Sequence, residues 1–147
     1  MTATLRIAVA LGAAFPELDV RAMAHRPPFI AAVGDAVTAL DGDADTVVAF
    51  VVNRGTLAGA RNPHGVVVAR LRELVAVERD RRAVVDEREE ARRWAALDRA
   101  ARRGETLRAL VDRGDLYPDE AASMLTSELA DDDLRATALA ALEGARR

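Results

Sequence analysis

Two helix boundaries lie close together in residues 53–74, and they constrain the fold more than any other part of the sequence. Gly55 follows an apolar run, and glycine often ends a helix because it tolerates a left-handed backbone. Asn62 is a good N-cap, and Pro63 suits the first position of a new helix. Residues 64–103 contain no proline, and their single glycine, Gly65, lies in the first turn of the predicted helix. The sequence therefore predicts one long helix after the junction.

Helical signals also fill the residues before this junction. Phe29, Val33 and Val37 recur at four-residue spacing, which is typical of one face of a helix. The valine-rich residues 47–52 would also suit a buried strand. Asp45 before this segment is a good N-cap and a glycine follows it, so we predict a helix there.

A compact helical pattern returns after the long helix. The pattern predicts a short helix from Gly104 to Gly114, a second helix with an acidic first turn after Pro118, and a last helix capped in the run Asp131 to Asp133. We therefore predict an all-α chain with an N-terminal helical bundle (1–77), a long charged helix (78–104) and a C-terminal three-helix unit (105–147).

Charged residues dominate the middle of the long helix. Glu78 with Arg82, and Glu89 with Arg93, have the i,i+4 spacing of helical ion pairs. This predicts a solvated helix, with a dimer-forming or partner-binding helix as the alternative. Trp94 interrupts the charged stretch, and we expect it to pack on the C-terminal helices. If exposed, it would instead mark an interaction site.

Composition excludes several classes of function. The chain has 147 residues and no cysteine, which excludes disulfides, thiolate metal sites and a cysteine nucleophile. Its net charge of −3 gives no support for nucleic-acid binding. No apolar run approaches the ~20 residues of a membrane span. We read the apolar N-terminal residues as a core helix and expect a cytoplasmic protein without a membrane partner.

Catalytic and metal-binding patterns are weak. His25 and His64 lie far apart in the sequence without carboxylates at ligand spacing. The serines, Ser123 and Ser127, have no histidine nearby in sequence. The aspartate-rich residues 41–45 lack the glycine and glutamate of a calcium loop, so we assign them to helix capping. We predict no enzyme activity, no metal and no cofactor.

Two residue sets are candidates for binding. Aromatic and apolar residues of the C-terminal half are the candidates for a protein partner: Trp94, Leu97, Leu116 and Tyr117. Basic and amide side chains around the central junction are the candidates for nucleic acid, because a helix N-terminus also attracts phosphate: Arg54, Arg61, Asn62 and Arg70.

Residues 53–74 resemble the closing segment of actinobacterial helix-turn-helix and plasmid- or phage-replication proteins, which often end on a helix, a turn and an Arg-Asn-Pro-x-Gly stretch followed by Ala-Arg-Leu. The resemblance implies a helical module from a regulatory or mobile-element protein. We expect a non-catalytic adaptor that binds a protein partner. The alternatives are a nucleic-acid-binding protein and a self-assembling structural component of the phage type.

Overall fold

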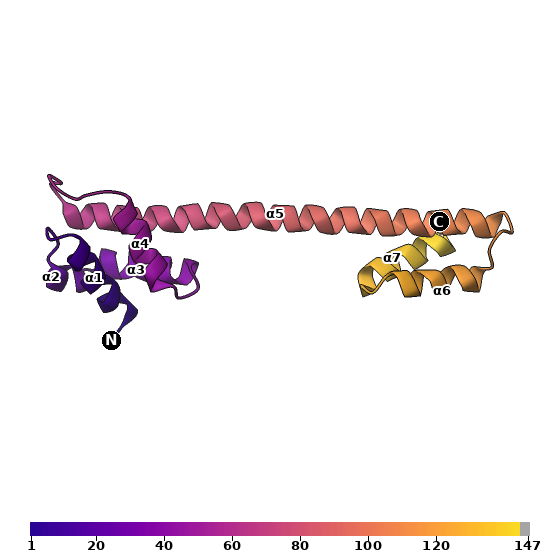
Figure 1. Ribbon diagram of the computed structural model, residues 1–147, viewed down its shortest axis with the longest axis horizontal. Helices are drawn as coiled ribbons and strands as arrows, with labels where there is room; N and C mark the ends of the chain where they lie inside the picture. The colour runs from indigo at the N-terminus through magenta and orange to yellow at the C-terminus, as the bar shows by residue number, and fades with distance from the viewer. Residues whose placement is uncertain (145–147) are drawn as a thin grey trace. The chain divides into compact units, whose positions relative to one another are not determined.

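The computed structural model describes residues 1–144, which form seven α-helices and no strand (Figure 1). The prediction of an all-α chain is confirmed. The chain divides into two compact units, Met1–Val84 and Val85–Arg147. Helix α5 (Pro63–Asp112) supplies residues to both units. The sequence-based division into residues 1–77, 78–104 and 105–147 stays a prediction about folding units.

The first unit is built from four shorter helices and the beginning of α5. The shorter helices are α1 (Ala3–Ala14), α2 (Val20–Ala24), α3 (Pro27–Ala39) and α4 (Ala44–Asn53). Most of them have a side-chain cap that satisfies a free backbone N–H of the first turn. Asn62 caps α5 as predicted, because its Oδ1 accepts from the Gly65 N–H at 3.0 Å.

The valine-rich segment is the helix α4, as predicted. Its N-cap is Asp43 and not Asp45. Asp43 accepts from the backbone N–H of Thr46 at 3.0 Å and from its hydroxyl at 2.6 Å, and these bonds lower the pKa of Asp43. Asp45 lies one residue inside the first turn and pairs with Arg6 at 3.1 Å. The aspartates of residues 41–45 thus serve helix capping and pairing.

Large apolar side chains fill the first unit. Phe29, Ile7, Leu11 and Met23 are almost fully buried, and α5 contributes Leu71 to the same core. Removing such side chains from water is the main favourable contribution to folding.

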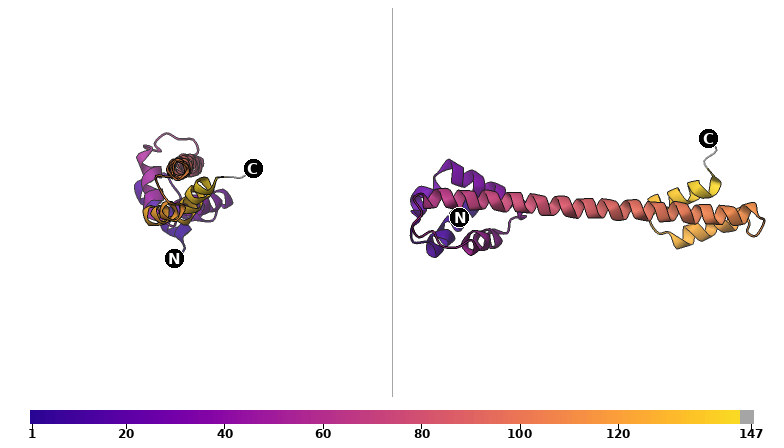
Figure 2. Two further views of the ribbon diagram at one scale, coloured as in Figure 1. Left: turned by 90° about the vertical axis from the view of Figure 1, so that its right-hand side faces the viewer. Right: turned by 90° about the horizontal axis from the view of Figure 1, so that it is seen from above.

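The second unit is a three-helix arrangement of the last part of α5 with α6 (Pro118–Glu128) and α7 (Asp132–Glu143). Helices α6 and α7 contact each other, and seen from above they lie on either side of the last part of α5 (Figure 2). The buried residues of the second unit include three alanines: Ala100, Leu107, Ala121, Leu125 and Ala138.

Helix α5 passes through Gly104, where the sequence predicted a new helix to begin. Glycine costs about 1 kcal/mol in a helix interior relative to alanine, which is too little to end a packed helix. The position also needs glycine, since a Cβ there would lie 2.1 Å from the carbonyl oxygen of Ala138. Gly104 therefore allows α7 to approach α5 closely.

None of the helices in residues 1–144 combines the length and the apolar character that crossing a bilayer requires.

Candidate partner-binding site

Trp94 lies on the solvent side of α5, with 65% of its surface exposed. The expectation that it packs on the C-terminal helices is therefore wrong. An α-helix turns by roughly 100° per residue. Trp94 is six residues before the buried Ala100, so its side chain points about 120° away from the core direction. Leu97 lies closer to that direction and is half-buried.

The indole of Trp94 has one polar contact in the described part of the chain. Its Nε1–H donates to Glu90 Oε1 at 3.5 Å, the limit of a hydrogen bond. Tryptophan offers a large apolar surface with one polar donor, which is why it is enriched among the residues that dominate binding energy in interfaces.

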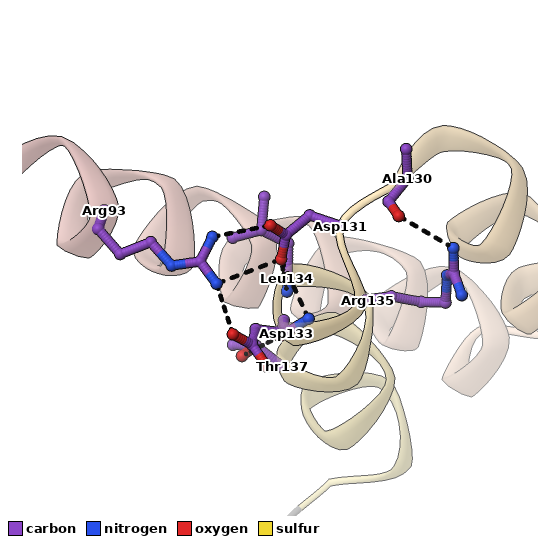
Figure 3. Close-up of polar contacts among 7 residues, drawn as sticks. All are labelled: Arg93, Ala130, Asp131, Asp133, Leu134, Arg135 and Thr137. Carbon is purple, nitrogen blue, oxygen red and sulfur yellow. Dashed lines mark hydrogen bonds and ion pairs between the residues drawn. The ribbon is translucent and has the colours of Figure 1, made fainter.

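Arg93, next to Trp94, binds the start of α7 (Figure 3). Its guanidinium donates to both carboxylate oxygens of Asp131 at 3.0 and 3.3 Å, and to Asp133 Oδ2 at 2.6 Å. The predicted Glu89–Arg93 pair is not formed, because Asp131 and Asp133 together offer the planar fork more acceptor oxygens in good geometry than one helical neighbour can.

Asp131 has two roles in this contact. Its Oδ1 also accepts from the backbone N–H groups of Asp133 and Leu134 at 3.0 Å each, so it caps α7 as predicted. The hydrogen bond from Arg93 and these backbone donors hold the pKa of Asp131 below its ordinary value. The same contact raises the pKa of Arg93.

Arg135 fixes the loop before α7. Its guanidinium donates to the carbonyl oxygen of Leu129 at 3.1 Å. It also donates to the carbonyl oxygen of Ala130 at 3.4 Å (Figure 3). The loop that Arg93 contacts is thus hydrogen-bonded from two sides. A surface held by these contacts loses little conformational entropy when a partner binds.

Leu116 and Tyr117 belong to a different surface of the second unit. Leu116 packs against the core, and Tyr117 is 75% exposed at the start of α6. From Trp94 to the end of α5 at Asp112 the helix rises about 27 Å. The structure therefore brings Trp94 and Leu97 together and places Leu116 and Tyr117 at the other end of the unit.

The residues predicted to bind nucleic acid lie around the α4–α5 junction, and most of them have partners within the first unit. Arg70 donates to the carbonyl oxygens of Val51 at 3.0 Å and Gly55 at 2.8 Å, which satisfies the end of α4. Arg54 pairs with Glu73 at 3.1 Å.

The other two candidates for nucleic-acid binding are Asn62 and Arg61. The Asn62 side chain caps α5, so its Oδ1 is occupied by the Gly65 N–H. Arg61 is exposed. Phosphate contacts by this set would therefore compete with existing structural contacts at three of the four positions.

Several arginines of α5 bind the ends of other helices, a pattern that the sequence analysis missed. In the first unit, Arg82 donates to the last carbonyl of α3, at Ala39, at 2.6 Å, and it forms the predicted pair with Glu78 at 3.4 Å. In the second unit, Arg103 binds Glu128 at the end of α6 through two hydrogen bonds of 3.0 and 2.7 Å. The partners lie 25 to 43 residues away, so no local spacing reveals them.

The described residues contain no group of three or more His, Asp or Glu side chains arranged to hold a metal ion. The ring of His64 accepts from the Asp19 N–H at 3.2 Å through Nε2, and His25 is exposed at the end of α2. Both histidines therefore have structural positions at helix ends.

Comparison with protein-family models, with curated proteins and with solved structures gives no match for this chain.

Proposed function

We propose that this chain is a non-catalytic helical interaction protein that binds a protein partner, with Trp94 as the central contact. The observation that carries the proposal is the 65% exposure of a tryptophan on a regular helix. A solvated indole keeps apolar surface in water, and a partner that covers it gains free energy from its burial.

The surroundings of Trp94 support binding of a protein. Residues 85–92, which precede it in the second unit, are all exposed and mostly charged, as in the polar rim of an interface. The contacts of Arg93 to Asp131 hold the neighbouring loop in one arrangement. The resemblance of residues 53–74 to replication and regulatory proteins adds the proposal that the chain is an adaptor of such a system.

Trp94 is the single tryptophan, so its fluorescence reports directly on this surface. We expect dilute protein to emit as a solvated indole and to be quenched fully by acrylamide. Affinity capture from a lysate of the source organism then compares the wild type with Trp94→Ala, and Tyr117→Ala is the matched control because Tyr117 is also an exposed aromatic residue. The proposal expects a protein retained by the wild type and by Tyr117→Ala, and lost with Trp94→Ala.

The other outcomes separate the alternatives. A blue shift of the emission with rising protein concentration, together with an oligomer in light scattering, would replace the proposal by self-assembly. Capture that disappears after nuclease treatment and weakens steeply with salt would replace it by nucleic-acid binding. Capture of the same proteins by Trp94→Ala would contradict the role of Trp94.

A further inference from the structure

A pocket of about 320 Å³ opens on the first unit, between α2, the start of α3 and the first turns of α5. Residues 65, 68, 69 and 72 of α5 line one side, and their spacing of three and four places them on one face of the helix. This volume is at the lower end of the range for pockets that bind small molecules.

The inner wall of the pocket is apolar. Met23 and Phe29 are buried core residues that also line it, and Val68 stands beside them on α5. Ala69 has a short side chain, and this leaves space in front of the α5 wall. The wall suits a small apolar group.

The polar part of the lining is positive. Arg26 and Arg72 line the pocket, and none of its lining residues is acidic. Two other arginines of α5 in this unit, Arg70 and Arg82, bind carbonyl or carboxylate oxygens. Within residues 1–144, the side chains of Arg26 and Arg72 form no hydrogen bond or ion pair, so their guanidinium groups keep their donors for another acceptor.

His64 and Asn62 add neutral donors. Because His64 Nε2 accepts from the Asp19 N–H, the neutral ring carries its proton on Nδ1. Asn62 uses its Oδ1 for the α5 cap, which leaves its amide N–H₂. The carboxylate of Asp19 accepts from the Ala22 N–H and does not line the pocket. The positive end of the α5 dipole lies at the same place.

From this arrangement we infer that the pocket binds a small organic anion, a carboxylate or phosphate carried on an apolar body. Arg26 and Arg72 bind the anionic group, and Met23, Phe29 and Val68 receive the apolar part. All residues of the site belong to the first unit, and none of them takes part in the proposed role of Trp94.

The test measures binding of four probes to the whole chain by two-dimensional amide NMR: phenyl phosphate, benzoate, inorganic phosphate and benzylamine. We expect saturable shifts of the Gly65, Val68 and Phe29 amides with phenyl phosphate or benzoate, and which of the two binds more tightly identifies the anionic group. Benzylamine has a similar apolar body with the opposite charge and should not bind.

Two substitutions locate the site. Arg72→Ala should weaken binding roughly tenfold or more, since a charge-assisted hydrogen bond contributes on that scale. Ala69→Leu should block the pocket without changing any charge. Arg79→Ala, at an exposed arginine of α5 outside the pocket, is the matched control and should bind like the wild type. Amide spectra and thermal melts check that each variant folds, and Arg26→Ala replaces Arg72→Ala if that variant does not.

Several results would overturn the inference. These are no saturable shift with either organic anion, equal binding of benzylamine, binding of inorganic phosphate alone, or unchanged affinity in both Arg72→Ala and Ala69→Leu.

Discussion

The two units of this chain use the same kind of element, but their interiors differ. The first unit buries large side chains such as Phe29, Ile7 and Met23. In the second unit, alanine makes up much of the buried set, and the largest members are Leu107 and Leu125. Since burial contributes about 25 cal/mol per Å² of apolar surface, the second unit gains less from its core. With a smaller core, it relies more on the contacts of α5 arginines to helix ends, such as those of Arg93 and Arg103, which predicts a less stable unit.

The strongest way to break the comparison is to remove a core leucine of the second unit. Leu107→Ala should cost about 2–5 kcal/mol, because Leu107 is fully buried and its truncation leaves a cavity in the core of the second unit. In a unit with so small a core we expect this loss to abolish the folded state of residues 85–144, while the first unit stays folded.

The measurement is urea unfolding followed by amide NMR, which reads the two units separately. Leu5→Ala, at a leucine that is 41% exposed, is the control and should hardly change the midpoint. A second unit that stays folded with Leu107→Ala at low urea concentration would show that its stability does not depend on this core.

A pair of glycine substitutions sharpens the comparison. A Cβ at Gly104 would meet the carbonyl oxygen of Ala138, so Gly104→Ala should destabilise the second unit by about 1–3 kcal/mol. A Cβ at Gly34 in α3 would meet nothing within 4 Å. Gly34→Ala should therefore stabilise the first unit by about 0.5–1 kcal/mol. Thermal melts of both variants check the opposite signs, and equal signs would contradict the close approach of α7.

The smallest expected effect is a loss of stability of the second unit at low pH. The pKa of Asp131 is lowered in the folded state, chiefly by the hydrogen bond from Arg93. The resulting stability is present above the ordinary Asp value of 3.8 and is lost as the pH falls through the lower folded value. Glu128, bound by Arg103, changes stability in the same direction below its ordinary value of 4.5.

Arg93→Ala should raise the Asp131 pKa toward its ordinary value and flatten this part of the acid dependence. The measurement is the urea midpoint of the second unit between neutral and strongly acidic pH, with carboxyl NMR of Asp131. Arg99→Ala, on the same helix and exposed, is the control. An Asp131 titration that is identical in the wild type and in Arg93→Ala would refute the contact.

Local signals were sufficient for the helices and several of their ends. Asn62 and Asp131 cap the helices predicted from sequence, since a cap depends on residues two or three positions away. The prediction that a new helix begins at Gly104 was wrong. The sequence shows the glycine, but it does not show the Ala138 carbonyl oxygen of α7 that lies beside it.

The candidate site depended on information that local spacing does not carry. The sequence identified Trp94 and Leu97 as candidates for partner binding, but it did not show which face of α5 the small second core would cover. Likewise, Arg70 was a candidate for nucleic-acid binding, and its carbonyl partners at the end of α4 and in the loop after it became apparent only from the structure. The sequence could supply residue types for these roles, but not their long-range partners.

The exposure of residues 83–92 has a consequence for how the chain is degraded. Helical turns without tertiary packing open locally far more often than a core does. Arg88 and Arg92 lie in this stretch, and an arginine-specific protease needs a briefly extended backbone at such a residue. The first cuts should therefore fall here, and they would release the two units as separate fragments long before either core is attacked.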